Sequence, residues 1–159
     1  MKVTLSWADM LLGAQVGVMR RLKNKLQRRR NDAYGMKGLG WNEDIHGALG
    51  ELAMSKMLGV SWDNMIAGDA NKRPDVGGYE VKAICERDYR LIVRDNDHDD
   101  KLVALVYGHG NTFEAIGWIR CGDAKRVASV ESHQGREPQY YVDQKHLHPF
   151  NVRTVGGTA

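Results

Sequence analysis

The stretch Arg73–Lys82, RPDVGGYEVK, decides how the middle of this chain can fold. A Gly-Gly pair between strand-forming residues is typical of a two-residue hairpin turn, because glycine adopts the positive φ that both turn positions need. If Gly77 and Gly78 form that turn, Val76 pairs with Tyr79. The sequence therefore predicts that the chain reverses direction here and returns as a strand.

The same turn would bring charged side chains together. Asp75 would lie opposite Glu80, with Cβ atoms about 4.5–5.5 Å apart, and strand alternation puts Lys82 on the face of Glu80. Two facing carboxylates repel each other unless one takes a proton or a cation lies between them. Lys82 is one candidate cation, and Mg²⁺ is the other, since it binds a few carboxylates together with water and phosphate oxygens. A solvated pair of surface charges is the simpler alternative.

A further carboxylate, Glu51, lies in the middle of a predicted helix over Glu43–Leu58. None of its neighbours three or four positions away can form a helical ion pair with it. Apolar residues occur nearly all round this helix, which is typical of a buried element. A carboxylate there needs a partner from elsewhere. Glu51 is therefore either part of a metal site or reaches solvent along a polar edge shared with Asp44 and Ser55.

Periodicity predicts the remaining elements. Ser6 is placed to cap a first helix, Asn42 to cap the second and Gly59 to end it. The first helix is predicted over residues 7–30, a short helix over 122–130, and strands over 75–76 with 79–84, 89–93, 102–107, 113–119 and 140–142. This order predicts an α/β or α+β layer fold around a mostly mixed sheet.

Composition and charge limit the class of protein. The 159 residues are 42% hydrophobic and 27% charged, as in a soluble globular protein, and no apolar run approaches the length of a membrane span or forms a secretory signal. Two cysteines without a CxxC pair favour a reducing cytoplasm. Residues 1–40 contain nine basic and two acidic residues, whereas residues 41–159 contain 14 and 18. This asymmetry indicates a polyanionic partner.

Most of the excess positive charge lies at the end of the first predicted helix. We call these residues the basic arm, and they are Arg20, Arg21, Lys23, Lys25, Arg28, Arg29 and Arg30. The arm is suited to contacts with a phosphate backbone. A solvated helix face or tail is the alternative.

The stretch 95–100, DNDHDD, has aspartates at the spacing of a calcium loop. It lacks the glycine and the glutamate that such a loop needs at its sixth and twelfth positions. We therefore expect a solvated acidic turn.

Together these motifs resemble the PD-(D/E)xK nuclease superfamily, in its small phage or bacterial form. Pro74-Asp75 is similar to the PD element and Glu80–Lys82 to the (D/E)xK element. Glu51 is similar to the acidic residue that many members carry on the helix before the sheet. The resemblance implies a restriction-endonuclease-like α-β-β-β-α-β core, with a central mixed sheet flanked by helices and an extra basic N-terminal helix. It also implies a metal ligand at the main-chain carbonyl of Val81.

The function implied is hydrolysis of DNA phosphodiester bonds with Mg²⁺ or Mn²⁺. Glu51, Asp75 and Glu80 would hold one or two ions, and Lys82 would assist the attacking water. Residues 1–40 would form the basic helix and a Gly-rich connection, and residues 41–159 the nuclease-like domain.

We expect DNA as the partner, no membrane, and a location in the cytoplasm of a bacterium or phage-infected cell, with a homodimer left open. Two alternatives remain: a non-catalytic nucleic-acid-binding or assembly module on the same fold, and a protein-interaction domain whose carboxylates bind no metal.

Overall fold

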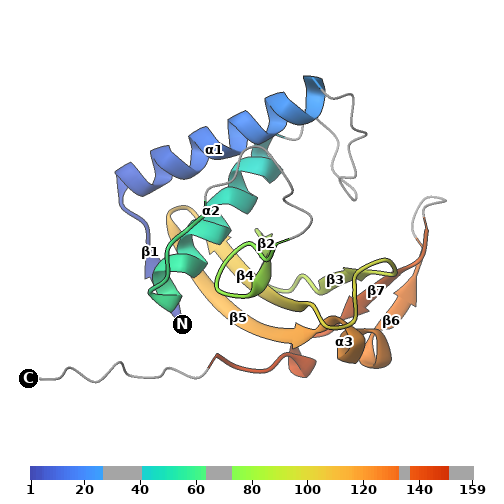
Figure 1. The fold of residues 1–159 in the computed structure, drawn as a ribbon. Helices are drawn as coiled ribbons and strands as arrows, with labels where there is room; N and C mark the ends of the chain where they lie inside the picture. Colours follow the sequence, from blue (N-terminus) through green and yellow to red (C-terminus); the bar gives the residue numbers. More distant parts are fainter. Residues whose placement is uncertain (27–40, 64–72, 133–136, 151–159) are drawn as a thin grey trace, which may run out of the picture.

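The computed structural model describes residues 1–26, 41–63, 73–132 and 137–150 (Figure 1). In chain order the elements are β1 (Lys2–Thr4), α1 (Trp7–Leu26), α2 (Trp41–Leu58), β2 (Tyr79–Ile84), β3 (Leu91–Arg94), β4 (Leu102–His109), β5 (Thr112–Arg120), α3 (Cys121–Val127), β6 (Ser129–Glu131), β7 (Gln139–Val142) and the 3₁₀ turn η2 (Gln144–His146). None of the helices in these ranges is long and apolar enough to cross a membrane.

The strands form two sheets. The larger has the order β1-β5-β4-β2, in which β2 is parallel to β4 and the other pairs are antiparallel. The smaller is antiparallel, with the order β3-β7-β6. Helices and a mixed sheet confirm the predicted α+β class.

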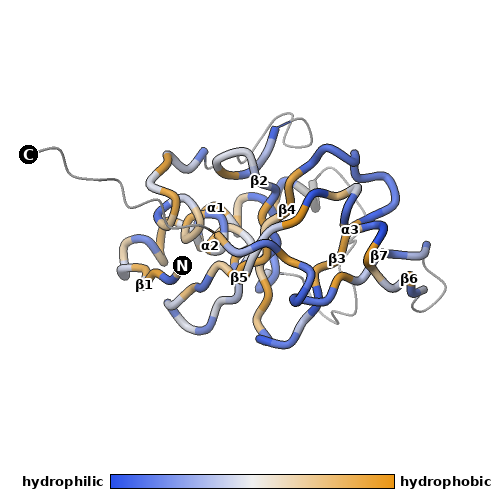
Figure 2. Tube along the Cα trace, turned by 90° about the horizontal axis from the view of Figure 1, so that it is seen from below, coloured by the Kyte–Doolittle hydropathy of each residue, from blue (hydrophilic) through white to orange (hydrophobic). Residues whose placement is uncertain are grey.

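Strand β4 is hydrophobic along much of its length (Figure 2), and its residues contribute to the core on both faces. Ala104 and Val106 face α2, whereas Val103 and Leu105 face the cluster formed by β3, β7 and α3. All four residues are at most 1% exposed. A strand that is buried on both faces reads as a continuous apolar run, which is why LVALV carries no alternation in the sequence.

Helix α2 lies between α1 and the larger sheet (Figure 1). Against the sheet, Gly50 lets the helix backbone approach Ala83 on β2, since a Cβ at Gly50 would be 2.6 Å from that of Ala83. Against α1, Gly13 and Gly17 form the contact, and a Cβ at Gly17 would be only 2.4 Å from the Cα of Ile45. Small residues on both sides therefore set how closely the three layers stack.

The local signals in the sequence are confirmed. Gly77 and Gly78 have φ of 56° and 92°, and Val76 and Tyr79 exchange hydrogen bonds of 3.0 and 2.8 Å across the turn. At α1, Ser6 Oγ accepts from the backbone N–H of Asp9, and the Asp9 carboxylate accepts from the N–H of Ser6. This reciprocal pair closes the first turn of the helix.

Both ends of α2 were predicted to within a few residues. Gly59 ends the helix with φ of 66°, and the N–H of Val60 bonds to the carbonyl of Ser55. The helix begins at Trp41, one residue before the predicted cap Asn42. The proposed extension of the first helix over residues 27–30 lies outside the described residues, as does the predicted domain boundary at residue 40.

Other elements differ from the prediction. Strand β1 was not foreseen and pairs with β5, while α1 packs on α2, so residues 1–26 pack against the rest of the fold. The predicted helix over 122–130 was wrong at its end, because the chain turns into β6 at Ser129. The first predicted strand is reduced to a single bridge at Val76.

The close contact at Gly17 gives a stability prediction. We expect Gly17→Ala to lower the free energy of unfolding by about 2 kcal/mol or more, because the new Cβ meets the backbone of α2 rather than a side chain that can move. The measurement is urea unfolding followed by circular dichroism.

Gly47 on α2 is the matched control, since a Cβ there meets nothing within 4 Å. Gly47→Ala should stabilise the protein by about 0.5–1 kcal/mol through helix propensity. Equal effects of the two substitutions would contradict the packing described here.

Candidate functional site

The candidate site surrounds β2, which is an edge strand of the larger sheet. An edge strand leaves backbone N–H groups without a neighbouring strand. At β2 the carboxylate of Asp75 accepts the N–H of Val81 at 2.8 Å. The glycine turn makes this possible because it folds Asp75 back beside the strand that follows. The turn thus fixes the position of the first site carboxylate.

Asp75 is electrostatically coupled to the other two predicted carboxylates. Burial, together with the charges of Glu51 and Glu80, raises the pKa of Asp75 to about 7, against the lowering effects of the Val81 N–H and of Lys82. The three acidic residues and the lysine named from the sequence therefore converge on the edge of β2. We call Glu51, Asp75, Glu80 and Lys82, together with Arg20 and Lys101, the β2-edge cluster.

Glu51 is buried in α2 and does not reach solvent along a polar edge, so that alternative was wrong. Its two carboxylate oxygens accept hydrogen bonds from the guanidinium of Arg20 on α1, at 2.6 and 2.8 Å. Trp62 Nε1 donates to Oε2 at 3.1 Å. The buried charge thus has a bidentate cation and an indole partner, which together offset its desolvation.

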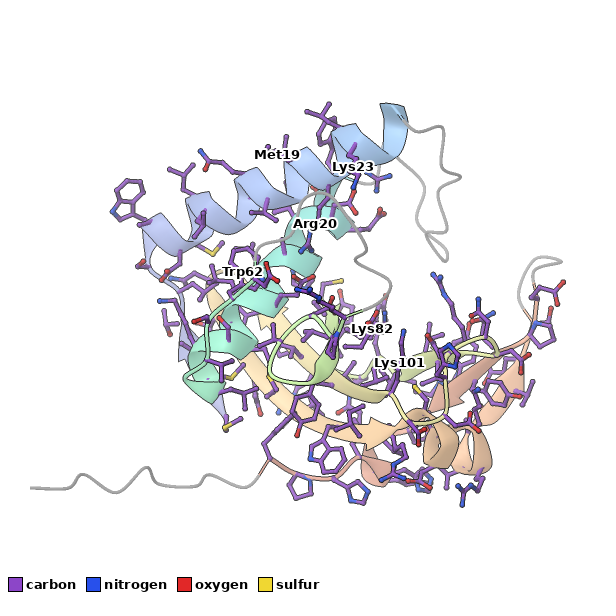
Figure 3. The ribbon with its side chains drawn as sticks, in the orientation of Figure 1. Met19, Arg20, Lys23, Trp62, Lys82 and Lys101 are labelled. Carbon is purple, nitrogen blue, oxygen red and sulfur yellow. The ribbon has the colours of Figure 1, made fainter. Side chains whose placement is uncertain are left out.

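Glu80 lies on the face of β2 away from α2, where two lysines surround it. Lys82 Nζ is 3.0 Å from Glu80 Oε1, and Lys101 Nζ is 3.8 Å from Glu80 Oε2 and 3.4 Å from Asp97 Oδ1. Burial opposes the charged form of Lys101, but Glu80 and Asp97 outweigh it and raise its pKa. Figure 3 shows Lys82 and Lys101 near each other, below Arg20 and Trp62.

Lys101 was missed by the sequence interpretation. It precedes Leu102, which is the register partner of Tyr79 at the start of β2. The parallel pairing therefore brings the start of β4 beside the turn, and only knowledge of that pairing could have placed Lys101 in the cluster.

The carboxylate oxygens of the cluster are the type of ligand atom that Mg²⁺ prefers, but they are not arranged around one common point. Within the described residues, no group of three or more His, Cys, Asp or Glu side chains is arranged to hold a metal ion. Arg20 and Lys82 instead supply the cations that Glu51 and Glu80 contact. Mg²⁺ commonly needs only one or two protein carboxylates beside water and phosphate oxygens. Asp75 has a raised pKa and forms no ion pair within the described residues, so it is the carboxylate that would gain most from such an ion.

The basic arm is only partly available for phosphate contacts. Arg21 is 5% exposed and pairs with Glu43 and Asp44, so its predicted contact with DNA was wrong. Its charge holds α1 against α2. Arg20 points into the β2-edge cluster, and Lys23 is partly exposed on α1 (Figure 3).

Of the other members of the arm, Lys25 lies in α1 with a side chain that is not described. Arg28, Arg29 and Arg30 lie outside the described residues.

A lysine on α3 contacts the acidic stretch 95–100 through several hydrogen bonds. Lys125 Nζ on α3 donates to the carbonyls of Asp95 and Asp97 at 3.0 and 2.7 Å and to the carboxylate of Asp99 at 2.9 Å. The ammonium group thus offsets part of the negative charge of the turn from within the chain, and Lys101 also pairs with Asp97. This explains how so many aspartates can share one loop.

Comparison with known proteins gives no matching family model, no similar curated protein and no similar solved structure. The function is therefore inferred from the residues of the β2-edge cluster alone.

The raised pKa of Asp75 gives a pH prediction. Because the folded state holds the Asp75 proton up to about pH 7, whereas the unfolded state loses it near 3.8, ionised Asp75 destabilises the fold as pH rises between these values. Asp75→Asn removes this effect. The stability of the variant relative to the wild type should rise by about 2 kcal/mol from pH 5 to pH 8, measured by urea unfolding without divalent ions.

Asp99→Asn is the control, because its effect on stability should change with pH in the opposite direction. The pKa of Asp99 is lowered by the hydrogen bond from Lys125, so Asp99→Asn should lose stability relative to the wild type as pH rises through the acidic range. A pH-independent difference for Asp75→Asn would mean that the carboxylate is not coupled to its neighbours.

Proposed function

We propose that this protein is a Mg²⁺-dependent DNA nuclease with a PD-(D/E)xK-type site on a restriction-endonuclease-like core. The observation that carries the proposal is the half-buried carboxylate of Asp75, which is coupled to Glu51 and Glu80 at the edge of β2 and flanked by Lys82. The cluster holds three carboxylates and three cations, but Arg20, Lys82 and Lys101 contact Glu51 and Glu80 and leave Asp75 with a raised pKa. A carboxylate without its own cation is suited to bind a divalent ion.

Each member of the cluster has a distinct task in this proposal. Asp75 and Glu80 would hold the ion together with the main-chain carbonyl of Val81, and Glu51 would join them on release from Arg20. A bound Mg²⁺ supplies Lewis-acid activation of water and of the scissile phosphate. The ion-pair partners of the carboxylates then become free to contact substrate.

The two lysines on the far face of β2 fit the chemistry of phosphodiester hydrolysis. Lys82 is 44% exposed and within 3.0 Å of Glu80, so its ammonium can reach both the carboxylate and a bound phosphate. In hydrolysis it would orient the attacking water or stabilise the negative charge that grows on the phosphate oxygens. Lys101, close by, would add positive charge on the same side.

DNA is the proposed substrate because positive charge extends from the cluster along α1. Arg20 and Lys23 lie on α1, Lys82 lies on β2, and Lys101 immediately precedes β4, so these cations come from segments that are far apart in the sequence (Figure 3). Ammonium and guanidinium groups bind phosphates in a sequence-independent and salt-sensitive manner. Arg21 is not among the residues proposed to contact DNA, because it is buried against α2.

One observation favours a second candidate, a non-catalytic nucleic-acid-binding module. Arg20 occupies both carboxylate oxygens of Glu51, and such a bidentate pair could be a permanent substitute for an ion. The two candidates differ in a simple property, because only the nuclease binds Mg²⁺ through Asp75.

We expect the purified protein to cleave DNA with Mg²⁺ or Mn²⁺ and to lose this activity with EDTA. Lys82→Met should lower the cleavage rate by about 100-fold or more, because the charge next to the phosphate is lost. DNA binding should remain within a few-fold of the wild type. Gel assays on duplex, single-stranded and branched DNA measure the rate, and fluorescence anisotropy measures the binding.

Lys145→Met is the matched control, because Lys145 is an exposed lysine that contacts Asp143 beside η2, outside the β2-edge cluster. It should cleave like the wild type. Cleavage that survives Lys82→Met would place the site elsewhere.

A measurement independent of activity separates the two candidates. At pH 8, 10 mM Mg²⁺ should raise the melting temperature of the nuclease by about 3 °C, assuming millimolar affinity. Asp75→Asn should abolish this rise. DNA binding without a Mg²⁺-dependent rise and without cleavage of any substrate would support the binding module instead.

A further inference from the structure

One face of α1 is apolar and exposed over nearly its whole length. The large hydrophobic side chains there are 41–78% exposed, and we call them the α1 stripe: Trp7, Leu11, Leu12, Met19 and Leu22. They account for most of the large exposed hydrophobic side chains of the described residues. Monomeric proteins rarely leave such a contiguous patch uncovered.

The stripe lies opposite the face of α1 that packs on α2. The packed face contains Gly13, Val16 and Gly17, which are buried, and at 100° per residue these positions point away from the stripe. In Figure 3, Arg20 lies on the side of α1 that faces α2 and Met19 on the other side. Among the residues that the structure describes, the stripe is therefore not part of the core.

The stripe has the pattern of a helix–helix seam. Two series of residues on this face repeat every seven positions: Ala8, Gln15 and Leu22 form one, and Leu11 and Val18 the other. Together the two series are spaced alternately by three and four residues, which is typical of paired helices. Between Trp7 and Leu22, the only polar residue on this face is Gln15, at its midpoint.

We propose that the α1 stripe binds the α1 stripe of a second copy of this chain, with the two helices antiparallel about a two-fold axis at Gln15. This proposal is independent of the nuclease activity.

The sequence of the stripe is complementary to itself in this arrangement. With Gln15 on the axis, Leu11 faces Met19 of the second copy and Ala8 faces Leu22 of the second copy. Leu12 likewise faces Val18 of the second copy, so the pairs along the middle of the seam are apolar, while Trp7 faces Lys23 of the second copy at each end. Gln15 would meet its own counterpart, and two side-chain amides can hydrogen-bond to each other. A single polar pair in an apolar seam fixes the register, because any shift would bury the amides without partners.

Charge favours the antiparallel over the parallel orientation. The basic arm begins at Arg20, at the C-terminal end of α1, whereas the N-terminal end carries Asp9. Parallel helices would place two basic arms side by side, and antiparallel helices hold them at opposite ends of the seam. Antiparallel helix dipoles also attract each other.

The size of the stripe sets the expected affinity. Sixteen residues from Trp7 to Leu22 span about 24 Å, and five half-exposed large side chains offer a few hundred Å² per copy, near the lower limit for a specific interface. We therefore expect a dimer that dissociates at micromolar concentrations.

Sedimentation velocity of the full-length protein from about 1 to 200 µM tests the proposal, with association increasing over this range. Leu11→Glu should weaken association at least tenfold, because it places a charge in the seam opposite Met19 of the second copy. Adding Met19→Lys to Leu11→Glu should restore part of the loss, since Glu and Lys then face each other across the axis, whereas adding Met19→Glu should not. Val130→Glu, at an exposed position on β6, is the control and should leave association unchanged.

Cross-linking tests the register without relying on affinity. In a Cys85→Ser background, which removes the exposed native thiol, Gln15→Cys should form a disulfide-linked dimer on mild oxidation and Leu11→Cys alone should not. Equal cross-linking of both variants would indicate parallel helices and overturn the proposal.

A monomer at every concentration would also overturn the proposal, as would a dimer that is insensitive to Leu11→Glu. Binding of the monomer to phospholipid vesicles through the stripe would assign this face to a membrane surface instead.

Discussion

A carboxylate that stays ionised in the interior needs a cation or several hydrogen-bond donors, and in this protein that requirement joins the helical layer to the site. Glu51 is held in the middle of α2, where its neighbours on the helix are apolar, so its partner has to come from another element. Arg20 reaches it from α1 with two hydrogen bonds. The contact aligns α1 over α2 and at the same time leaves the adjacent Asp75 as the carboxylate with the raised pKa. Packing and site chemistry therefore depend on the same ion pair.

The two faces of α1 have different physical tasks. The glycine face allows the close approach to α2 that brings Arg20 within reach of Glu51. The opposite face retains large apolar side chains that the described part of the chain leaves exposed. If this face pairs with its copy, Lys23 of each copy lies at an opposite end of the seam, and a dimer could contact a polyanion at two separated points. Arg21, buried against α2, shows that sequence position within a basic run does not determine exposure.

Local signals explain how much of the fold could be read from the sequence. The glycine turn, the cap at Ser6 and the end of α2 at Gly59 follow from interactions between residues a few positions apart, and all were predicted. The short strand β1 carries too few residues for a periodic signal. Pairing between β2 and β4 depends on contacts across more than twenty residues, so neither its parallel direction nor the place of Lys101 was available from the pattern.

By itself, the sequence determined that Asp75 and Glu80 flank a tight turn, because two adjacent glycines at that point leave the backbone one favourable way to reverse. It also determined that Glu51 needs a partner from another element, because no residue within one helical turn can neutralise it. Only the tertiary structure decided that this partner is Arg20, that Lys101 joins Lys82, and that Arg21 is buried. These outcomes depend on which distant elements pack together, and long-range packing is set by the whole core rather than by any local stretch of residues.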